Sequence, residues 1–353
     1  MSARLIVVGA GPGGVSAALW ARGRCEVLVI ERAARAGGQL RAIHFVPPEL
    51  PGSDVRDGAA LADACERQLE SAGVRVRYET AAAGLERRGR GVALVLERGG
   101  RLAADAILIA TGLRRRRLQV PGETDFEGRG VSTSATRDRE ALAGRDVLIV
   151  GGGDAAFENA LHLAEAGSRV TIAVRGRARA RREFRERAAA APRIEVLPGA
   201  RVTAFLGDDR LRAVRLERGG AERERAFEAA VVKIGSIPNT EWCARAVRAD
   251  AAGFLRADAR GRTSVPRVWA AGDVIRPPVF AISVAAAGAA LAIHDALGAL
   301  GALAAPPRAA ARARKRTRPE QKLRAAATGR VVRAGMRAGA QGRRTTRRTS
   351  TRG

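Results

Sequence analysis

The stretch VVGAGPGG near the N-terminus constrains the fold more than any other feature of this chain. Gly9, Gly11 and Gly14 form a G-x-G-x-x-G pattern directly after the apolar run Leu5–Val8 and directly before a helical stretch. The first glycine permits a tight turn, the second lets the backbone approach a pyrophosphate, and the third lets the helix pack closely on the strand. Pro12 suits the first turn of that helix, whose free N–H groups attract phosphate. The stretch therefore predicts a dinucleotide-binding βαβ unit.

A carboxylate stands where such a unit needs one. The second strand-like run, Cys25–Glu31, ends about 20 residues after the glycine turn. The carboxylate of Glu31 is placed to accept hydrogen bonds from both hydroxyls of a ribose. A glycine pattern alone is weak evidence, but a strand, a turn, a helix and an acid in register are strong evidence for a bound dinucleotide.

The same pattern restarts in the middle of the chain. Gly151, Gly153 and Ala156 form G-x-G-x-x-A between the strand-like run DVLIV and a helical stretch that opens at Asp154. The next strand ends in TIAVRGR, so Arg175 stands near the position where an acid would select a 2′-hydroxyl. A guanidinium there favours a 2′-phosphate, which it binds through two hydrogen bonds.

Other arginines lie close to Arg175 in the sequence. In our interpretation Arg181 shares the phosphate, with Arg177 and Arg182 beside it. The alternative is that each is an ordinary member of an Arg-rich surface. Because that alternative does not explain the missing acid, we expect this unit to prefer NADPH to NADH.

A third signature is the run AAGDV, which places Gly272 and Asp273 after a strand and before a helix. The carboxylate of Asp273 suits a ribityl hydroxyl, and the helix N-terminus suits a phosphate or a flavin carbonyl. The alternative is an acidic helix cap without a ligand. Two dinucleotide units in one chain usually relay electrons between a resident flavin and a transient nicotinamide. The expected cofactors are therefore FAD and NADPH.

Strand-like runs alternate with helical stretches through both halves of the chain. This alternation predicts an α/β fold with parallel sheets, and 353 residues of which 46% are hydrophobic allow two or three domains. We find no apolar run of the roughly 20 residues that a membrane helix needs and no secretory signal pattern. A cytoplasmic location without membrane association is therefore expected. Cys25, Cys65 and Cys243 have neither CxxC nor zinc-type spacing, so we expect no metal site.

The formal charge of +27 is unevenly distributed. From Arg308 onward there are sixteen Lys or Arg residues against one acid, Glu320. Such a run is typical of a solvated, disordered tail, which binds polyanions only weakly through its charge. No aromatic residue follows Phe280, so the tail has no base-stacking platform, and nucleic-acid binding is not expected beyond this weak attraction.

Six motifs, GAGPGG, GGQL, ATG, GGGDAAFENA, REFR and AAGD, occur in this order. In these motifs the chain resembles thioredoxin reductase and its relatives, the two-domain flavoprotein pyridine nucleotide–disulfide oxidoreductases, over residues 3 to about 300. The resemblance implies two Rossmann-like, three-layer domains in a homodimer, with the NADPH domain inserted in the FAD domain. The implied segments are 1–115 and 241–304 for FAD, 116–240 for NADPH, and 305–353 for the tail. It also implies that further residues hold the cofactors, namely Gly38, Gln39, Leu40, Thr111 and Gly112.

The loop before the second glycine turn departs from this family. Thioredoxin reductases read like GVSYCATCDG here, whereas this chain reads GVSTSATRDR, with Ser134 and Arg137 in the places of the two redox cysteines. A dithiol works because a thiolate attacks a disulfide and the partner thiol resolves the mixed intermediate. Neither serine nor arginine supplies that chemistry. We therefore expect no thioredoxin reduction through an internal dithiol, and we assign no catalytic residue.

Two further features concern residues that the resemblance places near the flavin. Relatives carry an Arg-Gln pair shortly before the last helix, where this chain has Val279 and Phe280. His44 follows GGQL in a loop that passes close to the flavin in relatives and is a candidate proton relay. His162 and His294 fall inside helical stretches, which favours a structural role.

Three classes of function remain open from the sequence. The leading hypothesis is an FAD-dependent NADPH oxidoreductase whose acceptor is a small molecule or a small redox protein. Reduction of ferredoxin or flavodoxin is one version of this hypothesis. It is less favoured because such relatives tend to carry an aromatic C-terminal extension, whereas no aromatic residue follows Phe280 here. A second class is a non-catalytic, nucleotide-binding redox sensor. A third is a nucleic-acid-associated protein that binds through its tail.

Overall fold

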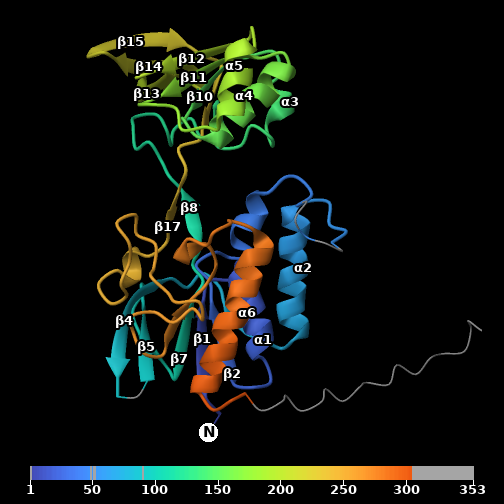
Figure 1. The fold of residues 1–353 in the computed structure, drawn as a ribbon, viewed down its shortest axis with the longest axis vertical. Coiled ribbons are helices and arrows are strands. Elements are labelled where there is room, and N and C mark those ends of the chain that lie inside the picture. The colour runs from blue at the N-terminus through green and yellow to red at the C-terminus, as the bar shows by residue number, and fades with distance from the viewer. Residues whose placement is uncertain (1, 48–49, 51–52, 90, 304–353) are drawn as a thin grey trace, which may run out of the picture. The chain divides into compact units, whose positions relative to one another are not determined.

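The structure is a computed structural model that describes residues 2–303 apart from 48, 49, 51, 52 and 90. The predicted disordered tail, residues 305–353, lies outside the described residues. The described chain forms two lobes, each built on its own five-stranded parallel sheet (Figure 1).

The sheet of the first lobe has the strand order β18-β7-β1-β2-β3, and every neighbouring pair is parallel. Its last strand comes from near the far end of the described chain, so segments more than 200 residues apart build one sheet. The strands are β1 (Arg4–Val8), β2 (Glu26–Ile30), β3 (Arg75–Arg77), β7 (Ala106–Ile109) and β18 (Val268–Ala270). This arrangement confirms the predicted βαβ pattern at the N-terminus.

Three helices cover one face of this sheet, and a three-stranded antiparallel sheet covers the other. Leu5 and Val7 of β1 pack among the helices, whereas Ile6 and Val8 pack against the antiparallel strands. Because both faces are buried, the strand is a continuous apolar run rather than an alternating one. The covering elements are α1 (Pro12–Ala21), α2 (Gly58–Ser71), α6 (Ile282–Ala299), β4 (Ala82–Arg88), β5 (Gly91–Leu96) and β6 (Arg101–Ala104).

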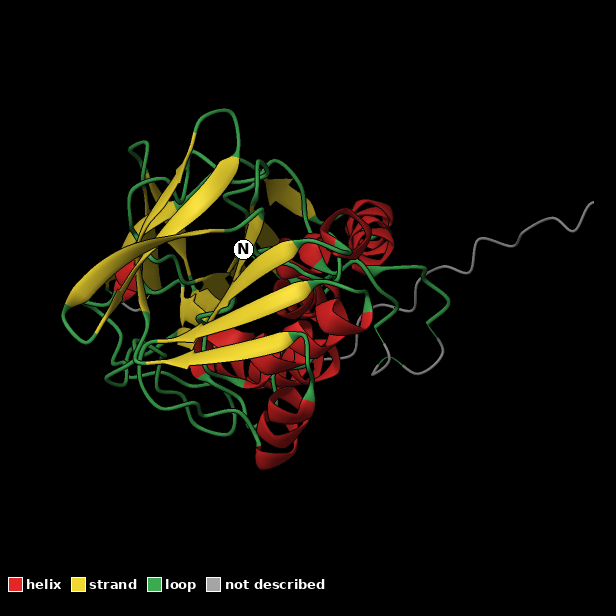
Figure 2. Ribbon diagram, turned by 90° about the horizontal axis from the view of Figure 1, so that it is seen from above, coloured by secondary structure: helices red, strands yellow, loops and turns green. Residues whose placement is uncertain are grey.

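The sheet of the second lobe has the order β12-β11-β10-β16-β9 and is also wholly parallel. Its strands are β9 (Val131–Ser132), β10 (Asp146–Val150), β11 (Arg169–Val174), β12 (Ile194–Pro198) and β16 (Ala229–Val232). Helices lie on one face of it and an antiparallel sheet on the other, as the red and yellow ribbons of Figure 2 show. These layers are α3 (Arg139–Leu142), α4 (Asp154–Glu165), α5 (Arg182–Ala190), β13 (Arg201–Gly207), β14 (Leu211–Arg218) and β15 (Ala221–Ala226).

The chain crosses between the two sheets twice, and the two crossings pair with each other. β8 (Leu113–Arg115) and β17 (Ser236–Pro238) form a two-stranded antiparallel ribbon. β8 ends at Arg115 and β17 ends at Pro238, close to the implied domain boundaries at 115–116 and 240–241, which stay a prediction. Three short 3-10 helices also belong to the first lobe, namely η1 (Gly38–Ala42), η2 (Glu241–Cys243) and η3 (Gly272–Ile275).

Helix α6 alone among the described elements is long and apolar enough to cross a membrane by length and composition, with a mean hydropathy of 1.5. The expectation was that no apolar run reaches the roughly 20 residues of a membrane helix, and this helix has 18 residues. The helix packs against α1, where Ser16 donates a hydrogen bond to the carbonyl of Ala286, at 2.8 Å. Near its end, the carboxylate of Asp295 accepts hydrogen bonds from Arg262 and from the Trp269 indole. Core helices of globular domains share this composition, and α6 packs into the core of the first lobe.

Candidate functional site

The first glycine turn lines a cleft of about 1070 Å³ at the carboxyl end of the first sheet. Gly9 has φ +103°, and a Cβ there would lie 2.5 Å from the carbonyl oxygen of Ala110. A Cβ on Gly14 would lie 1.8 Å from the carbonyl oxygen of Gly9, so only glycine lets α1 approach β1 this closely. A Cβ on Gly11 would meet nothing within 4 Å, which leaves its backbone open to the cleft together with that of Pro12.

Glu31 lies at the end of β2 and lines this cleft, although only 7% of the residue is exposed. Its carboxylate accepts hydrogen bonds from the backbone N–H of Ala10, at 2.7 Å, and of Ala33, at 2.8 Å. These bonds hold the glycine turn against β2. Each carboxylate oxygen keeps a second lone pair for a ligand in the cleft, which is what the ribose prediction requires.

Asp273 lies in the first turn of η3 and lines the same cleft beside Gly272. Its carboxylate forms no hydrogen bond or ion pair with any residue between 2 and 303 that the structure places. Partial burial alone raises the pKa of this group above its usual value. A half-buried acceptor without a partner is what a hydroxyl-bearing ligand would satisfy.

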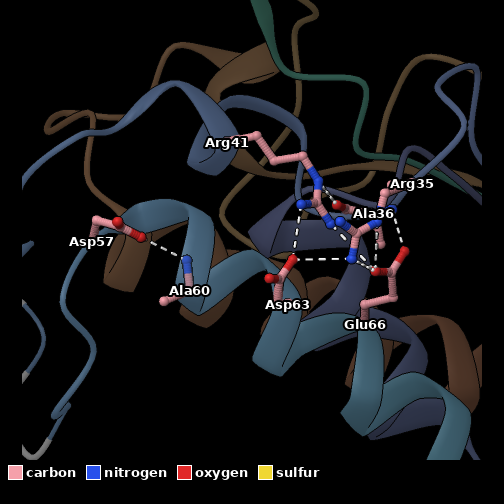
Figure 3. Close-up of polar contacts among 7 residues, drawn as sticks. All are labelled: Arg35, Ala36, Arg41, Asp57, Ala60, Asp63 and Glu66. Atoms are coloured by element: carbon pink, nitrogen blue, oxygen red, sulfur yellow. Dashed lines mark hydrogen bonds and ion pairs between the residues drawn. The ribbon is translucent and has the colours of Figure 1, made fainter. Parts of the chain in front are cut away.

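The GGQL turn reaches the cleft through Gly38, Gln39 and Leu40, and an ion-pair network ties it to α2 (Figure 3). Arg41 donates to Asp63 at 2.9 Å, and Arg35 donates to both Asp63 and Glu66. The carboxylate of Glu66 also accepts from the backbone N–H of Ala36, at 3.1 Å. Its side chain is only 13% exposed. The network fixes the backbone that leads into the cleft.

Burial raises the pKa of the Glu66 carboxyl, but the hydrogen bonds from Arg35 and Ala36 outweigh burial and hold that pKa below its usual value. Glu66 is therefore ionised at neutral pH and keeps the network intact. Nothing in the sequence pattern pointed to this pairing, because it joins residues about 30 positions apart.

Thr111 and Gly112 line the cleft where β7 leads into the ribbon. Thr111 Oγ1 donates to the carbonyl of Asn239, and Asn239 Nδ2 donates to the carbonyl of Thr111, both at 2.8 Å. Arg114 also donates to Asn239 Oδ1, at 2.9 Å. These reciprocal bonds clamp the two crossings together, and sequence reasoning missed the part that Asn239 takes in them.

An aromatic and cationic cluster lies at the rim of the first cleft, and of its members the sequence pointed only to Phe280. The Arg276 guanidinium lies 4.3 Å from the centroid of the Phe254 ring and pairs with Asp250 at 3.2 Å. The Phe254 and Phe280 ring centroids are 6.4 Å apart. Phe280 is 54% exposed and its neighbour Val279 is 59% exposed. An apolar edge therefore borders the cleft at the position where relatives were expected to carry an Arg-Gln pair.

The second glycine turn lines a separate cleft of about 1160 Å³ in the second lobe. Gly151 has φ +149°, and a Cβ there would lie 2.3 Å from the carbonyl oxygen of Lys233. Gly153 has nothing within 4 Å of the position where a Cβ would be, so its backbone is open to the cleft. Ala156 lies behind the turn and packs in the core. The charged lining is almost wholly cationic and consists of Arg116, Arg175, Arg177, Arg179, Arg201, Lys233 and one acid, Asp154.

The carboxylate of Asp154 already forms an ion pair with Arg181. Asp154 Oδ1 accepts from the backbone N–H of Arg181, at 2.7 Å, and Asp154 Oδ2 accepts from Arg181 Nε, at 3.0 Å. The Arg181 guanidinium also lies 4.5 Å from the centroid of the Phe184 ring. Arg181 does not line the cleft, so its phosphate-binding role stays a prediction that this geometry does not favour. Arg175 does line it, with Arg177 and Arg179 beside it.

The loop of Ser134 and Arg137 is closed by its own hydrogen bonds. Arg137 Nε and Nη2 pair with the Asp138 carboxylate at 2.6 and 2.7 Å. Ser132 Oγ also donates to Asp138 and accepts from the backbone N–H of Ser134, at 3.0 Å. Ser134 is 9% exposed. The hydrogen bond from Arg137 holds the pKa of Asp138 below its usual value, so the pair stays ionised near neutral pH.

The three thiols lie elsewhere. Cys25 precedes β2, Cys65 lies in α2 and Cys243 lies in η2. Burial raises the pKa of Cys25 to about 11 and that of Cys243 to about 12, and it also raises the pKa of Cys65. Because a thiolate is the reactive form, these groups are poor nucleophiles at neutral pH.

The histidines take no part in either cleft lining. His44 is exposed, and it is absent from the residues that line the first cleft. His162 and His294 are exposed on α4 and α6, and His162 lies 3.8 Å from Glu165. The relay role suggested for His44 therefore stays a prediction without support from this geometry.

Comparison with known proteins identifies the family of this chain and several similar proteins. Residues 3–292 match the family described as pyridine nucleotide-disulphide oxidoreductase. The thioredoxin reductase of Treponema pallidum is 34% identical over 297 residues, which is 83% of this chain and 95% of that protein. The NADH dehydrogenase of Bacillus subtilis is 30% identical over 76% of this chain, but the match covers only 53% of that longer protein.

Among solved structures, the thioredoxin reductase of Lactococcus lactis matches with a TM-score of 0.70 and 29% identity. The match covers 85% of this chain and 99% of that one. These findings confirm the predicted fold class, the predicted resemblance and the cofactors implied by it, FAD and NADPH.

Proposed function

Because this chain belongs to the pyridine nucleotide-disulphide oxidoreductase family, we propose that it is an FAD-dependent NADPH oxidoreductase without an internal dithiol. Its electrons would pass to an external acceptor, either a small molecule or a small redox protein. We further propose that it acts as a homodimer in the cytoplasm. The observation that carries the proposal is the presence of two glycine-turn clefts in one chain, one with free carboxylates and one without.

The first cleft fits FAD. When bound, FAD supplies a two-electron relay between a nicotinamide and an acceptor. Gly11 and Pro12 open the turn toward a pyrophosphate, and the N-terminus of α1 faces it. The Glu31 carboxylate would hold the ribose hydroxyls, and the unpartnered Asp273 carboxylate would hold a ribityl hydroxyl. The network around Glu66 keeps Gly38, Gln39 and Leu40 in place along the same wall.

The second cleft fits NADPH. Gly151 and Gly153 bring the backbone close to a pyrophosphate at the start of α4. Arg175 at the end of β11 would pair with a 2′-phosphate, and Arg177 and Arg179 lie beside it. No carboxylate in this lining is free to select a 2′-hydroxyl, because Asp154 pairs with Arg181. The distribution of charge therefore favours NADPH over NADH.

The loop at 132–138 has no part in electron transfer under this proposal. Ser134 and Arg137 are both used in the hydrogen bonds that close the loop. The electrons must then leave the flavin directly for the acceptor. The exposed Phe280 at the rim of the first cleft, with its exposed chain neighbour Val279, offers an apolar edge to an acceptor that approaches there.

Anaerobic stopped-flow mixing of the FAD-loaded protein with NADPH tests the proposal. We expect the flavin absorbance band to bleach promptly, and then to return on mixing with a low-molecular-weight disulfide, a quinone, oxygen or a small redox protein. The acceptor that restores it fastest identifies the substrate class. A flavin band that NADPH leaves unchanged would favour a non-catalytic binding protein and overturn the proposal.

A further inference from the structure

Lys233 is chemically unusual in this chain. The sequence contains only three lysines, Lys233, Lys315 and Lys322, among 63 basic residues. Lys233 follows directly after β16 and lines the second cleft. Within the described chain its ammonium has no hydrogen bond and no ion pair. A half-buried cation that faces a cleft without a partner calls for an anion supplied by a ligand.

The position of Lys233 in the sheet narrows the choice of anion. β11 and β12 lie on one side of β10, whereas β16 and β9 lie on the other, so the strand order reverses between β10 and β16. Ligands of open parallel sheets bind in the crevice at such a reversal, at the carboxyl ends of the strands. The backbone N–H of Lys233 donates to the carbonyl of Val150 at 2.7 Å, directly before the Gly151 turn. Lys233 therefore lies directly beside the turn that faces a pyrophosphate, on the β16 side of the crevice.

Three of the five arginines that line the same cleft are placed differently. Arg175 follows the end of β11, on the other side of β10 from Lys233, and Arg177 and Arg179 come after it in the chain. These three arginines line the side of the cleft where a 2′-phosphate is expected. Lys233 lies on the opposite wall, which leaves the pyrophosphate as the anion that it faces.

We propose that Lys233 is a binding residue for pyridine dinucleotides, and that its ammonium pairs with the pyrophosphate. The inference rests on the proposed function, because it assumes that the second cleft binds a dinucleotide. Lys233 would therefore contribute to the affinity for the pyrophosphate, which NADP⁺ and NAD⁺ share. Arg175 would contribute to the affinity for the 2′-phosphate, which only NADP⁺ carries.

The charges around Lys233 give the interaction a pH dependence. Burial lowers the pKa of Lys233 to about 8, with a smaller lowering from the positive charge of Arg115, and Glu158 opposes both. The other charged side chains of the same lining are Asp154, which is paired with Arg181, and the arginines Arg116, Arg175, Arg177, Arg179 and Arg201. An arriving pyrophosphate would raise the pKa of Lys233, so binding takes up a proton above about pH 8.

Equilibrium binding of NADP⁺, NAD⁺ and adenosine 2′-monophosphate to the FAD-loaded protein tests the inference. We expect Lys233→Met to weaken both dinucleotides by the same factor, about tenfold or more, because a charge-assisted contact is lost. Adenosine 2′-monophosphate has no pyrophosphate, so its affinity should change less than about twofold. Arg175→Ala should do the reverse and weaken NADP⁺ and adenosine 2′-monophosphate while sparing NAD⁺.

Two further variants control this experiment. Lys233→Arg keeps the charge and should stay within about threefold of the wild type, with no titration near pH 8. Arg218→Met removes an exposed cation of β14 outside the cleft and should change no affinity, which separates local contact from net charge. In the wild type, NAD⁺ affinity should fall about tenfold from pH 7 to 9 as Lys233 loses its proton, and the fall should vanish in Lys233→Arg.

Several outcomes would overturn the inference. Unchanged dinucleotide affinity in a folded Lys233→Met protein would do so, because the cleft would then bind without the ammonium. A loss confined to NADP⁺ and adenosine 2′-monophosphate would assign Lys233 to the 2′-phosphate instead. A wild type that binds neither dinucleotide would overturn the proposed function as well, so the two failures are distinguishable.

Discussion

The two clefts share a strand–glycine turn–helix scaffold but differ in their acids. The first holds Glu31 and the unpartnered Asp273, whereas the only acid that lines the second, Asp154, is neutralised by Arg181. The glycines of both turns serve the same purpose, since both bring bare backbone to a phosphate. The difference teaches that the turn selects the class of ligand, whereas the ends of the neighbouring strands select the nucleotide.

The largest effect is expected from removing the acid of the first cleft. Glu31→Ala leaves the buried N–H groups of Ala10 and Ala33 without an acceptor and removes the proposed ribose contact. Each such loss costs about 1–3 kcal/mol, so FAD affinity should fall about 100-fold or more, measured as the flavin content after dialysis. NADP⁺ binding in the second lobe should not change. Full flavin occupancy would break the comparison by showing that the acid does not select the ligand.

The nucleotide preference of the second cleft is tested by removing the guanidinium of Arg175. Arg175→Ala should lower the preference for NADPH over NADH about tenfold, because the charged partner of the 2′-phosphate is lost. The measurement is the ratio of kcat/KM for the two nucleotides. Arg185→Ala, which removes an exposed arginine of α5 outside the cleft, is the matched control and should leave the ratio unchanged. An unaltered ratio in Arg175→Ala would assign nucleotide choice elsewhere.

A smaller effect follows from the half-buried charge of Asp273. Because burial raises its pKa in the folded protein, the protonated form is the stabilising one. Its contribution is therefore present below the ordinary Asp pKa of about 3.9 and is lost as the pH rises through the higher folded value. In FAD-free protein, Asp273→Asn should remove this loss and raise the melting temperature above that pH by about 1–2 °C. A wild type and a variant with parallel pH profiles would contradict this origin of the shift.

The smallest effect is expected in the loop that lacks cysteines. Arg137→Ala removes an exposed ion pair with Asp138 and should cost at most about 1 kcal/mol of stability. Flavin reduction by NADPH should stay within about twofold of the wild type. A markedly slower reduction, of about tenfold, would show that the loop takes part in electron transfer after all.

The sequence predicted the parallel framework well because that framework depends on local patterns. The apolar runs before Gly9 and Gly151 became β1 and β10, and the helices after them begin within about two residues of the expected positions. The antiparallel layer β4–β6 was not anticipated, because its strands carry no distinctive motif.

The candidate site was predictable only where a motif carries it. Glu31, Arg175 and Asp273 line the clefts as expected, because each follows a recognisable strand. Lys233 and Asn239 were missed, since their importance depends on which strands become neighbours. That information resides in the sheet order and in long-range hydrogen bonds, which no local pattern records.

Anaerobic titration of the FAD-loaded protein with NADPH tests the central claim most directly. A chain whose only redox centre is a flavin should bleach completely with about one equivalent of NADPH per flavin. A requirement for about two equivalents would reveal a hidden disulfide that also accepts electrons, and an unbleached flavin would show that no hydride crosses between the clefts. Either result would contradict the account.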